Sequence, residues 1–214
     1  MSAGASPDLG FTHRFESATS EAAPTLLVLH GTGGDENDLL PLGRAILPGA
    51  ALLSPRGKVL ENGMPRFFRR LAEGVFDQED LAVRTDDLAE FIQAAFERYG
   101  IDRSRLFALG FSNGANMAAS VLLRFPDRLA GAILIRTMVP FVPKPVPDLR
   151  GKSVLLLSGR EDPIVPTDQA EKLAGIFKSA AADVTLHWEN VGHALTQGDV
   201  SVARDWLKRV LHTS

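Results

Sequence analysis

Short apolar segments bounded by turn-forming residues recur along the chain. They occupy residues 25–29, 51–53, 106–109, 132–135 and 154–157. Apolar runs of this length are typical of strands that are buried on both faces of a parallel sheet. The pattern therefore predicts a parallel sheet at the core of the protein.

Stretches with helical periodicity lie between these segments. Their apolar residues recur at i, i+3, i+4 and i+7, which places them on one face of a helix. They are Leu88, Phe91, Ile92, Ala95, Phe96 and Tyr99; Ala118, Val121, Leu122 and Phe125; Leu173, Ile176, Phe177 and Ala180; and Ala203, Trp206, Leu207, Val210 and Leu211. The alternation predicts one α/β domain over residues 1–214, with a mostly parallel central sheet, helices on both faces and a flexible segment 1–8.

Two segments depart from the alternation. Residues 56–80 combine glycines and aromatic residues with Arg66, Arg69 and Arg70. Long loops are usually functional or disordered, and the aromatic content argues against disorder. Such an arginine trio is more often a solvated face or a subunit contact, as in a homodimer, than a group that steers an acidic substrate. Residues 136–152 contain four prolines and are expected to form a covering connection between two strands.

Composition and charge narrow the classes of function. The 214 residues carry 23 Lys and Arg against 26 Asp and Glu, so the formal charge of −3 provides no broad basic surface for nucleic acid. Cysteine is absent, which excludes disulfides, a thiolate nucleophile and cysteine-ligated metals. The sequence shows neither a signal-peptide core nor an apolar run of membrane-spanning length, so we expect a cytoplasmic protein.

A G-x-S-x-G motif centred on Ser112 lies between a predicted strand and a predicted helix. This context is typical of a nucleophile elbow, in which small neighbours allow the serine to occupy a strained turn at the C-terminal edge of the sheet. The pentapeptide alone is only suggestive, and its position makes Ser112 the candidate nucleophile. The alternative is a glycine-rich turn in which Ser112 caps the helix.

A serine nucleophile needs a base, and in this type of fold the acid and then the histidine follow the serine along the chain. His193 follows the alternating stretch 184–188, so it is expected in a loop at the end of a strand. His187 is expected within that strand, His212 lies near the terminus and His13 precedes the predicted sheet. His193 is therefore the candidate base.

The candidate acid follows the predicted strand 154–157, where Glu161 and Asp162 compete. Asp162 precedes Pro163 and stands beside a turn, where it can accept hydrogen bonds from backbone amides and stay ionised next to an imidazole. We therefore prefer Asp162. The alternative is that Asp162 is an N-terminal acid of a helix that begins near Thr167.

A glycine-rich segment, residues 30–36, follows the predicted strand 25–29. Glycines let backbone amides approach a developing oxyanion, and in this type of fold the second amide belongs to the residue after the nucleophile. These amides are those of Thr32 and Asn113. The alternative, a phosphate-binding loop, lacks both G-x-G-x-x-G and a P-loop motif, and His30 is expected to form structural hydrogen bonds beneath the loop.

Four motifs, H-G-T-G-G-D-E, G-F-S-N-G-A, G-R-E-D-P-I-V-P and G-H-A-L, occur in this order over nearly the whole chain. Together they resemble the small bacterial carboxylesterases of the α/β-hydrolase superfamily, in the phospholipase/carboxylesterase branch that includes acyl-protein thioesterases. The resemblance implies an α/β-hydrolase fold, a catalytic triad of Ser112, Asp162 and His193, and oxyanion-hole amides at Thr32 and Asn113.

One departure concerns the residue after the nucleophile. Acyl-protein thioesterases usually have glutamine there, whereas this chain has Asn113. Together with the stretch 62–76, this residue makes the chain more similar to the esterases associated with hydroquinone-stress hydrolases.

These features predict a serine carboxylesterase that hydrolyses short to medium acyl esters through an acyl-enzyme, without a metal or other cofactor. The connection 136–152 is too short to form the cap domain that larger hydrolases of this fold insert there, so the site should be open. The residues expected to line the substrate pocket, for each of which a core role is about equally compatible with the sequence, are Phe68, Met138, Val139, Ile164 and Leu195.

Other activities stay open at this stage. One is an acyl-protein thioesterase or lysophospholipase-like activity, and another is that of a dienelactone hydrolase or perhydrolase, although the missing cysteine excludes the usual thiol nucleophile of the former. A different class is a ligand-binding receptor that retains the hydrolase fold with little turnover.

Overall fold

The computed structural model describes residues 9–20 and 23–213, so the expected flexible segment 1–8 lies outside the described residues. Their core is a seven-stranded sheet with the strand order β1-β3-β2-β8-β9-β10-β11. All neighbouring strands are parallel except β1, which is antiparallel to β3. The strands are β1 (His13–Glu16), β2 (Thr25–Leu29), β3 (Ala51–Pro55), β8 (Leu106–Phe111), β9 (Gly131–Ile135), β10 (Ser153–Gly159) and β11 (Asp183–Glu189).

The strands predicted from apolar runs are confirmed as β2, β3, β8, β9 and β10, and the alternating stretch 184–188 lies in β11. All residues of β2, β3 and β9 are buried, which explains why these strands appear as continuous apolar or small-residue runs. β1 was not predicted from the sequence. This strand has only four residues, lies partly exposed at the sheet edge and therefore contains no apolar run.

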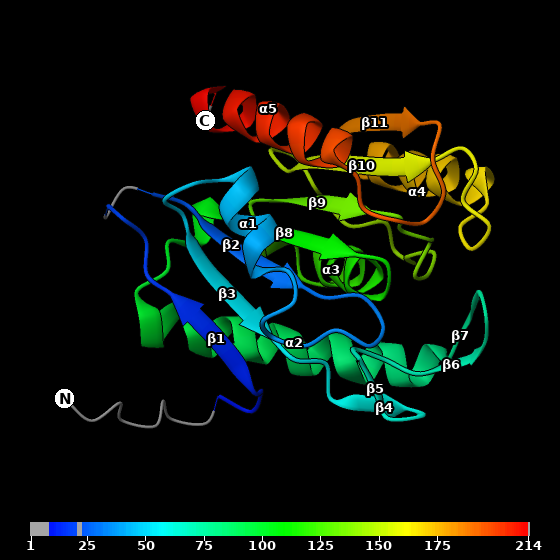
Figure 1. Ribbon diagram of the computed structural model, residues 1–214, viewed down its shortest axis with the longest axis horizontal. Helices are drawn as coiled ribbons and strands as arrows, with labels where there is room; N and C mark the ends of the chain where they lie inside the picture. Colours follow the sequence, from blue (N-terminus) through cyan, green and yellow to red (C-terminus); the bar gives the residue numbers. More distant parts are fainter. Residues whose placement is uncertain (1–8, 21–22, 214) are drawn as a thin grey trace.

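Helices cover both faces of the sheet, as predicted (Figure 1). One face carries α2 (Gln78–Tyr99), α3 (Asn113–Arg124) and α4 (Thr167–Ser179), and the other carries α1 (Leu40–Ile46) and α5 (Gln197–Thr213). The four stretches with helical periodicity correspond to α2, α3, α4 and α5. Helix α1 was not predicted from the sequence, because its seven residues are too few to establish a period. Two 3₁₀ turns, Arg103–Arg105 and Pro126–Arg128, precede β8 and β9.

The long segment 56–80 is more ordered than expected. It forms two hairpins, β4 (Val59–Glu61) with β5 (Met64–Arg66) and β6 (Arg70–Ala72) with β7 (Val75–Phe76). The expectation of a solvated arginine face is wrong for Arg66, whose side chain is 5% exposed. The connection 136–152, in contrast, contains neither helix nor strand.

The C-terminal ends of the parallel strands lie along one edge of the sheet, on the same side of the molecule as the two hairpins (Figure 1). In a parallel α/β sheet this edge is where ligands bind, because the loops that follow the strands gather there. The loop after β2, the turn after β8 and the loops after β10 and β11 carry the candidate residues of the site. Within the described ranges, no helix has both the length and the apolar character that crossing a membrane would require.

Candidate active site

Ser112 occupies the sharp turn between β8 and α3. Its backbone adopts φ 51° and ψ −114°, a strained conformation for a residue with a side chain. The flanking glycines are required because the chain packs closely here: a Cβ atom on Gly110 would lie 2.6 Å from Cα of Ala115, and one on Gly114 would collide with the carbonyl oxygen of Leu29. The turn therefore has the geometry of a nucleophile elbow.

His193 connects Ser112 with Asp162 through both nitrogens of its ring. Nε2 lies 2.9 Å from Oγ of Ser112, and Nδ1 lies 2.8 Å from Oδ2 of Asp162. An ionised carboxylate only accepts hydrogen bonds, so Nδ1–H donates to Asp162 and Nε2 is left to accept the proton of the serine hydroxyl. The structure thus brings together the three side chains that the motifs indicated.

Asp162 is held from the side opposite to the histidine. Its Oδ1 accepts hydrogen bonds from the amides of Ile164 at 2.8 Å and Val165 at 3.0 Å, and its side chain is 1% exposed. The alternative role of a helix acid does not apply, because α4 begins at Thr167 and the bonded amides belong to the preceding turn. The competing Glu161 is exposed on the protein surface.

The two residues of the candidate oxyanion hole lie along the cavity that contains the serine. Thr32 and Asn113 line the same cavity as Ser112, and Asn113 is the first residue of α3, where backbone N–H groups have no carbonyl partner within the helix. Both side chains are engaged elsewhere: Oγ1 of Thr32 accepts from Arg66 at 2.7 Å, and Oδ1 of Asn113 accepts from the amide of Phe67 at 2.7 Å. The segment after β4 therefore braces both positions.

His30 supports the glycine-rich loop from below. Its Nδ1 donates to the carbonyl of Gly31 at 2.7 Å, and its Nε2 accepts from the amide of Gly57 at 2.9 Å. The residue is fully buried, and burial lowers the pKa of its imidazole below the ordinary value of 6.5. The neutral ring matches this pair of hydrogen bonds, which confirms the expected structural role.

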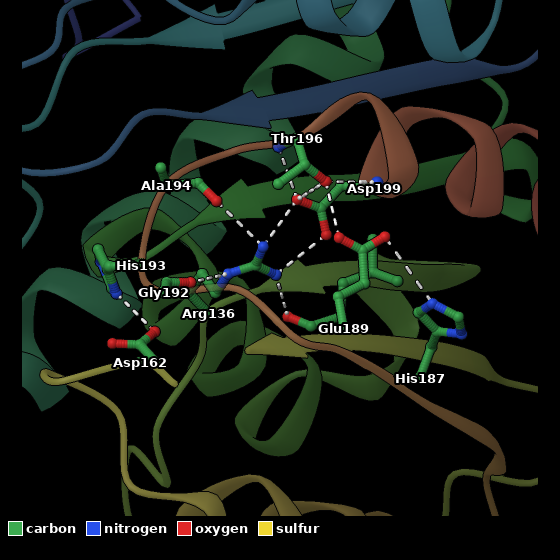
Figure 2. A network of polar contacts seen from close by, with 10 residues as sticks. Arg136, Asp162, His187, Glu189, Gly192, His193, Ala194, Thr196 and Asp199 are labelled. Carbon is green, nitrogen blue, oxygen red and sulfur yellow. Dashed lines mark hydrogen bonds and ion pairs between the residues drawn. The ribbon is translucent and has the colours of Figure 1, made fainter. Parts of the chain in front are cut away.

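Arg136 is a residue of the site that the sequence analysis missed. It follows β9 with a positive φ of 55°, is fully buried, and uses all five of its N–H groups (Figure 2). Nε donates to the carbonyl of Gly192 at 3.1 Å and Nη2 to that of Ala194 at 3.0 Å, the two neighbours of His193. The guanidinium therefore holds the histidine loop on both sides. The only available signal was a lone arginine at the end of an apolar strand.

Asp199 neutralises this buried arginine. Its two carboxylate oxygens accept from Nη1 at 3.0 Å and Nη2 at 2.8 Å, while the remaining proton of Nη1 goes to the carbonyl of Leu157 at 3.1 Å. The amide of Thr196 also donates to Asp199 at 2.9 Å, while its hydroxyl lies within hydrogen-bond distance of both Asp199 at 3.1 Å and Glu189 at 2.8 Å. This fork-to-fork pair connects the end of β9 with the first turn of α5.

A cavity of about 310 Å³ contains the serine and the histidine. Its other lining residues are Thr32, Arg66, Arg70, Glu73, Gly74, Phe76, Phe111, Asn113, Asn116, Arg136, Met138, Ile164 and Val165. Two of the expected pocket residues, Met138 and Ile164, are among them. The described residues contain no cluster of His, Asp and Glu side chains suited to a metal ion.

The expectation that Phe68, Val139 and Leu195 line this cavity is corrected by the structure. Phe68 is fully buried in the core beneath α2 and α3, and Val139 packs against the same core. Leu195 packs against the cluster under α1 and α5. Each of these apolar residues follows a predicted strand or lies in a loop, but its side chain turns toward the core.

Comparison with known proteins agrees with this architecture. Residues 12–211 match the family model described as Phospholipase/Carboxylesterase. The chain is 48% identical over 199 residues to "Putative hydrolase MhqD" of Bacillus subtilis (strain 168), covering 93% of this chain and 98% of that protein. It is similar to the Bacillus cereus carboxylesterase, with a TM-score of 0.91, 48% identity and 94% of each chain covered. A carboxylesterase from Mesorhizobium loti has a TM-score of 0.89 and 32% identity, covering 94% of this chain and 96% of the other.

The sheet, the two helix layers and these similarities define the class as α/β hydrolases, here without a cap domain between β9 and β10. The chain belongs to the phospholipase/carboxylesterase family and is an esterase. The family resemblance drawn from the four sequence motifs is thereby confirmed.

Proposed function

We propose that this chain is a serine carboxylesterase that hydrolyses short to medium acyl esters. The observation that carries the proposal is the continuous series of hydrogen bonds from Asp162 through His193 to Ser112 beside an accessible cavity. A serine in this arrangement has a base within reach of its proton and a carboxylate that orients the base.

The proposed reaction proceeds through an acyl-enzyme. His193 Nε2 takes the proton of Ser112 as Oγ attacks the ester carbonyl carbon, and the amides of Thr32 and Asn113 donate to the resulting oxyanion. Asp162 stabilises the imidazolium, which then protonates the departing alcohol. Water repeats these steps on the acyl group and releases the carboxylic acid, so the cycle needs no metal or cofactor.

The assignment of the nucleophile can be tested with Ser112→Ala. Hydrolysis of 4-nitrophenyl acetate should fall at least about a thousandfold, because the covalent intermediate can no longer form. Ser201→Ala, which changes an exposed serine of α5, should keep normal activity. A fluorophosphonate should label the wild-type protein rapidly and Ser112→Ala not at all. Absence of labelling in the wild type would instead support a receptor with little turnover.

The size of the cavity underlies the proposed acyl-chain preference. A volume of about 310 Å³ is at the small end for ligand pockets, so long acyl chains would extend beyond it. Across a series of 4-nitrophenyl esters, kcat/KM should be highest for acyl chains of about two to eight carbons. A maximum at sixteen carbons would contradict the proposed preference.

A further inference from the structure

Two arginines lie on the wall of the cavity that contains Ser112. Arg66 ends β5 and Arg70 begins β6, so each hairpin contributes one guanidinium. Neither takes part in the proposed proton transfers. The side chain of Arg66 is 5% exposed and that of Arg70 is 28% exposed. Burying a guanidinium costs free energy because it removes a charge from water, so we expect a function for an arginine that is largely buried beside the nucleophile.

The negative charge around this pair is incomplete. Arg66 and Arg70 share one carboxylate, Glu61, whose oxygens lie 3.2 Å and 2.9 Å from their Nε atoms. The other partners of Arg66 are neutral oxygens, the hydroxyl of Thr32 and the carbonyl of Phe68, and no hydrogen bond from its Nη2 is formed within the described part of the chain. The buried Arg136 differs, because its partner Asp199 forms an ion pair with no other described residue.

The shift in the pKa of Arg66 agrees with this incomplete compensation of charge. Burial, followed by the charge of Arg70, lowers the pKa of its guanidinium, while Glu61 acts in the opposite direction. Glu73 also lines the cavity, but it is exposed and forms no ion pair with a described residue. An anion that entered the cavity could therefore accept a hydrogen bond from Nη2 of Arg66. It would also be attracted by the positive charge of the two arginines, which Glu61 only partly offsets.

We propose that Arg66 and Arg70 form a subsite for a carboxylate of the substrate, so that the preferred substrates are small esters carrying a free carboxylate. The inference rests on the proposed esterase reaction, because both arginines share the cavity of Ser112. The planar fork of a guanidinium matches a carboxylate in shape as well as charge. Since Arg66 contacts the side chain of Thr32, the bound carboxylate would lie only a few bonds from the ester that is cleaved.

A pair of substrates that differ only in charge tests the subsite. The mono-4-nitrophenyl ester of adipic acid has a free carboxylate, and its methyl-capped counterpart does not. Wild-type kcat/KM should favour the charged ester by about tenfold, the effect of one charge-assisted hydrogen bond. Arg66→Gln and Arg70→Gln should each bring this ratio towards one, mainly by raising KM for the charged ester, and added salt should weaken the preference.

Arg69→Gln is the matched control. Arg69 lies between the other two in sequence, but its side chain is 62% exposed, pairs with Asp77 and Asp80, and does not line the cavity. This variant should keep the wild-type ratio. Competitive inhibition of the wild type by adipate, but not by its uncharged diamide adipamide, provides a second measurement that does not depend on the folding of any variant.

Three outcomes would overturn the subsite. They are a wild-type ratio of one or less, equal slowing of both esters in Arg66→Gln and Arg70→Gln, and equal inhibition by adipate and adipamide. Equal slowing would indicate that Arg66 only braces the Thr32 loop. None of these outcomes affects the proposed esterase reaction, which is tested separately by the activity of Ser112→Ala and by fluorophosphonate labelling of the wild type.

Discussion

The two oxygens of Asp162 have separate tasks. Oδ1 is taken by the amides of Ile164 and Val165, which fix the orientation of the carboxylate, while Oδ2 faces Nδ1 of His193. The motif around Asp162 allowed this residue to be predicted, because a proline-bounded turn after a strand exposes backbone amides to a preceding aspartate. The division of tasks also determines what an asparagine would do at this position.

Asp162→Asn should lower kcat for 4-nitrophenyl acetate by about a thousandfold or more. The amide oxygen of asparagine would still accept from the turn, which leaves its NH₂ group facing His193. Nδ1 would then have to accept, so Nε2 would carry the proton and could not take the one on Ser112. Glu161→Gln, a neutral substitution at the exposed neighbour, should retain activity. A loss of less than tenfold in Asp162→Asn would show that the carboxylate does not set the tautomer.

At the scale of elements, Arg136 joins strand ends and loops that are distant in sequence. Its backbone amide donates to the carbonyl of Leu157 in β10 at 2.9 Å, and the carbonyl of Ile135 before it accepts from the amide of Ser112 at 2.8 Å. Its side chain reaches the histidine loop and α5. Arg136 thus ties the strand that precedes the acid to the loop of the base, and the preceding Ile135 binds the turn of the nucleophile.

Arg136→Met should destabilise the protein by about 3–5 kcal/mol, because it leaves the fully buried Asp199 without its charge partner. Urea unfolding would measure this change. Arg150→Met removes an arginine whose ion pair with Asp148 is largely exposed, and it should leave the midpoint of urea unfolding nearly unchanged.

The double variant Arg136→Met/Asp199→Leu separates stability from positioning. It should recover part of the lost stability, because no unpaired charge remains in the interior. Its kcat should nevertheless stay about ten- to a hundredfold below that of the wild type. The carbonyls of Gly192 and Ala194 would still lack their donors, so the histidine loop would shift. Full recovery of kcat in the double variant would show that Arg136 has no positioning role.

At the scale of the whole molecule, the predictable features are those that a local pattern encodes. The buried strands, the long amphipathic helices and the order of Ser112, Asp162 and His193 all follow from periodicity or motif context. The two hairpins do not follow from a local pattern, because their short strands depend on hydrogen bonds to residues distant in sequence. Examples are the bond from the amide of Phe67 to the side chain of Asn113 and the bond from the amide of Gly33 to the carbonyl of Pro65. Phe68 lies between these hairpins and is buried in the core, a position that no local pattern encodes, so the pocket was only partly predictable.

His30 connects this local chemistry to the stability of the whole fold. Its neutral ring bridges the glycine-rich loop and Gly57, and burial lowers its pKa below 6.5. As the pH falls below 6.5, the unfolded chain takes up this proton while the folded protein resists it, so the free energy of unfolding decreases. The slope from one such group is at most about 1.4 kcal/mol per pH unit.

The contribution of His30 should be measurable by urea unfolding between pH 7.5 and 5.5. The carboxylates whose pKa is lowered in the folded protein, such as Asp35 and Glu36, start from 3.8 and 4.5, so their effect on stability falls at lower pH. His30→Gln should be less stable at pH 7.5 but show a smaller loss between pH 7.5 and 5.5, while His212→Gln, at an exposed position, should retain the wild-type slope. An unchanged slope in His30→Gln would mean that the folded protein accepts the proton on this ring, and the buried bridge would then have to open as the protein is acidified.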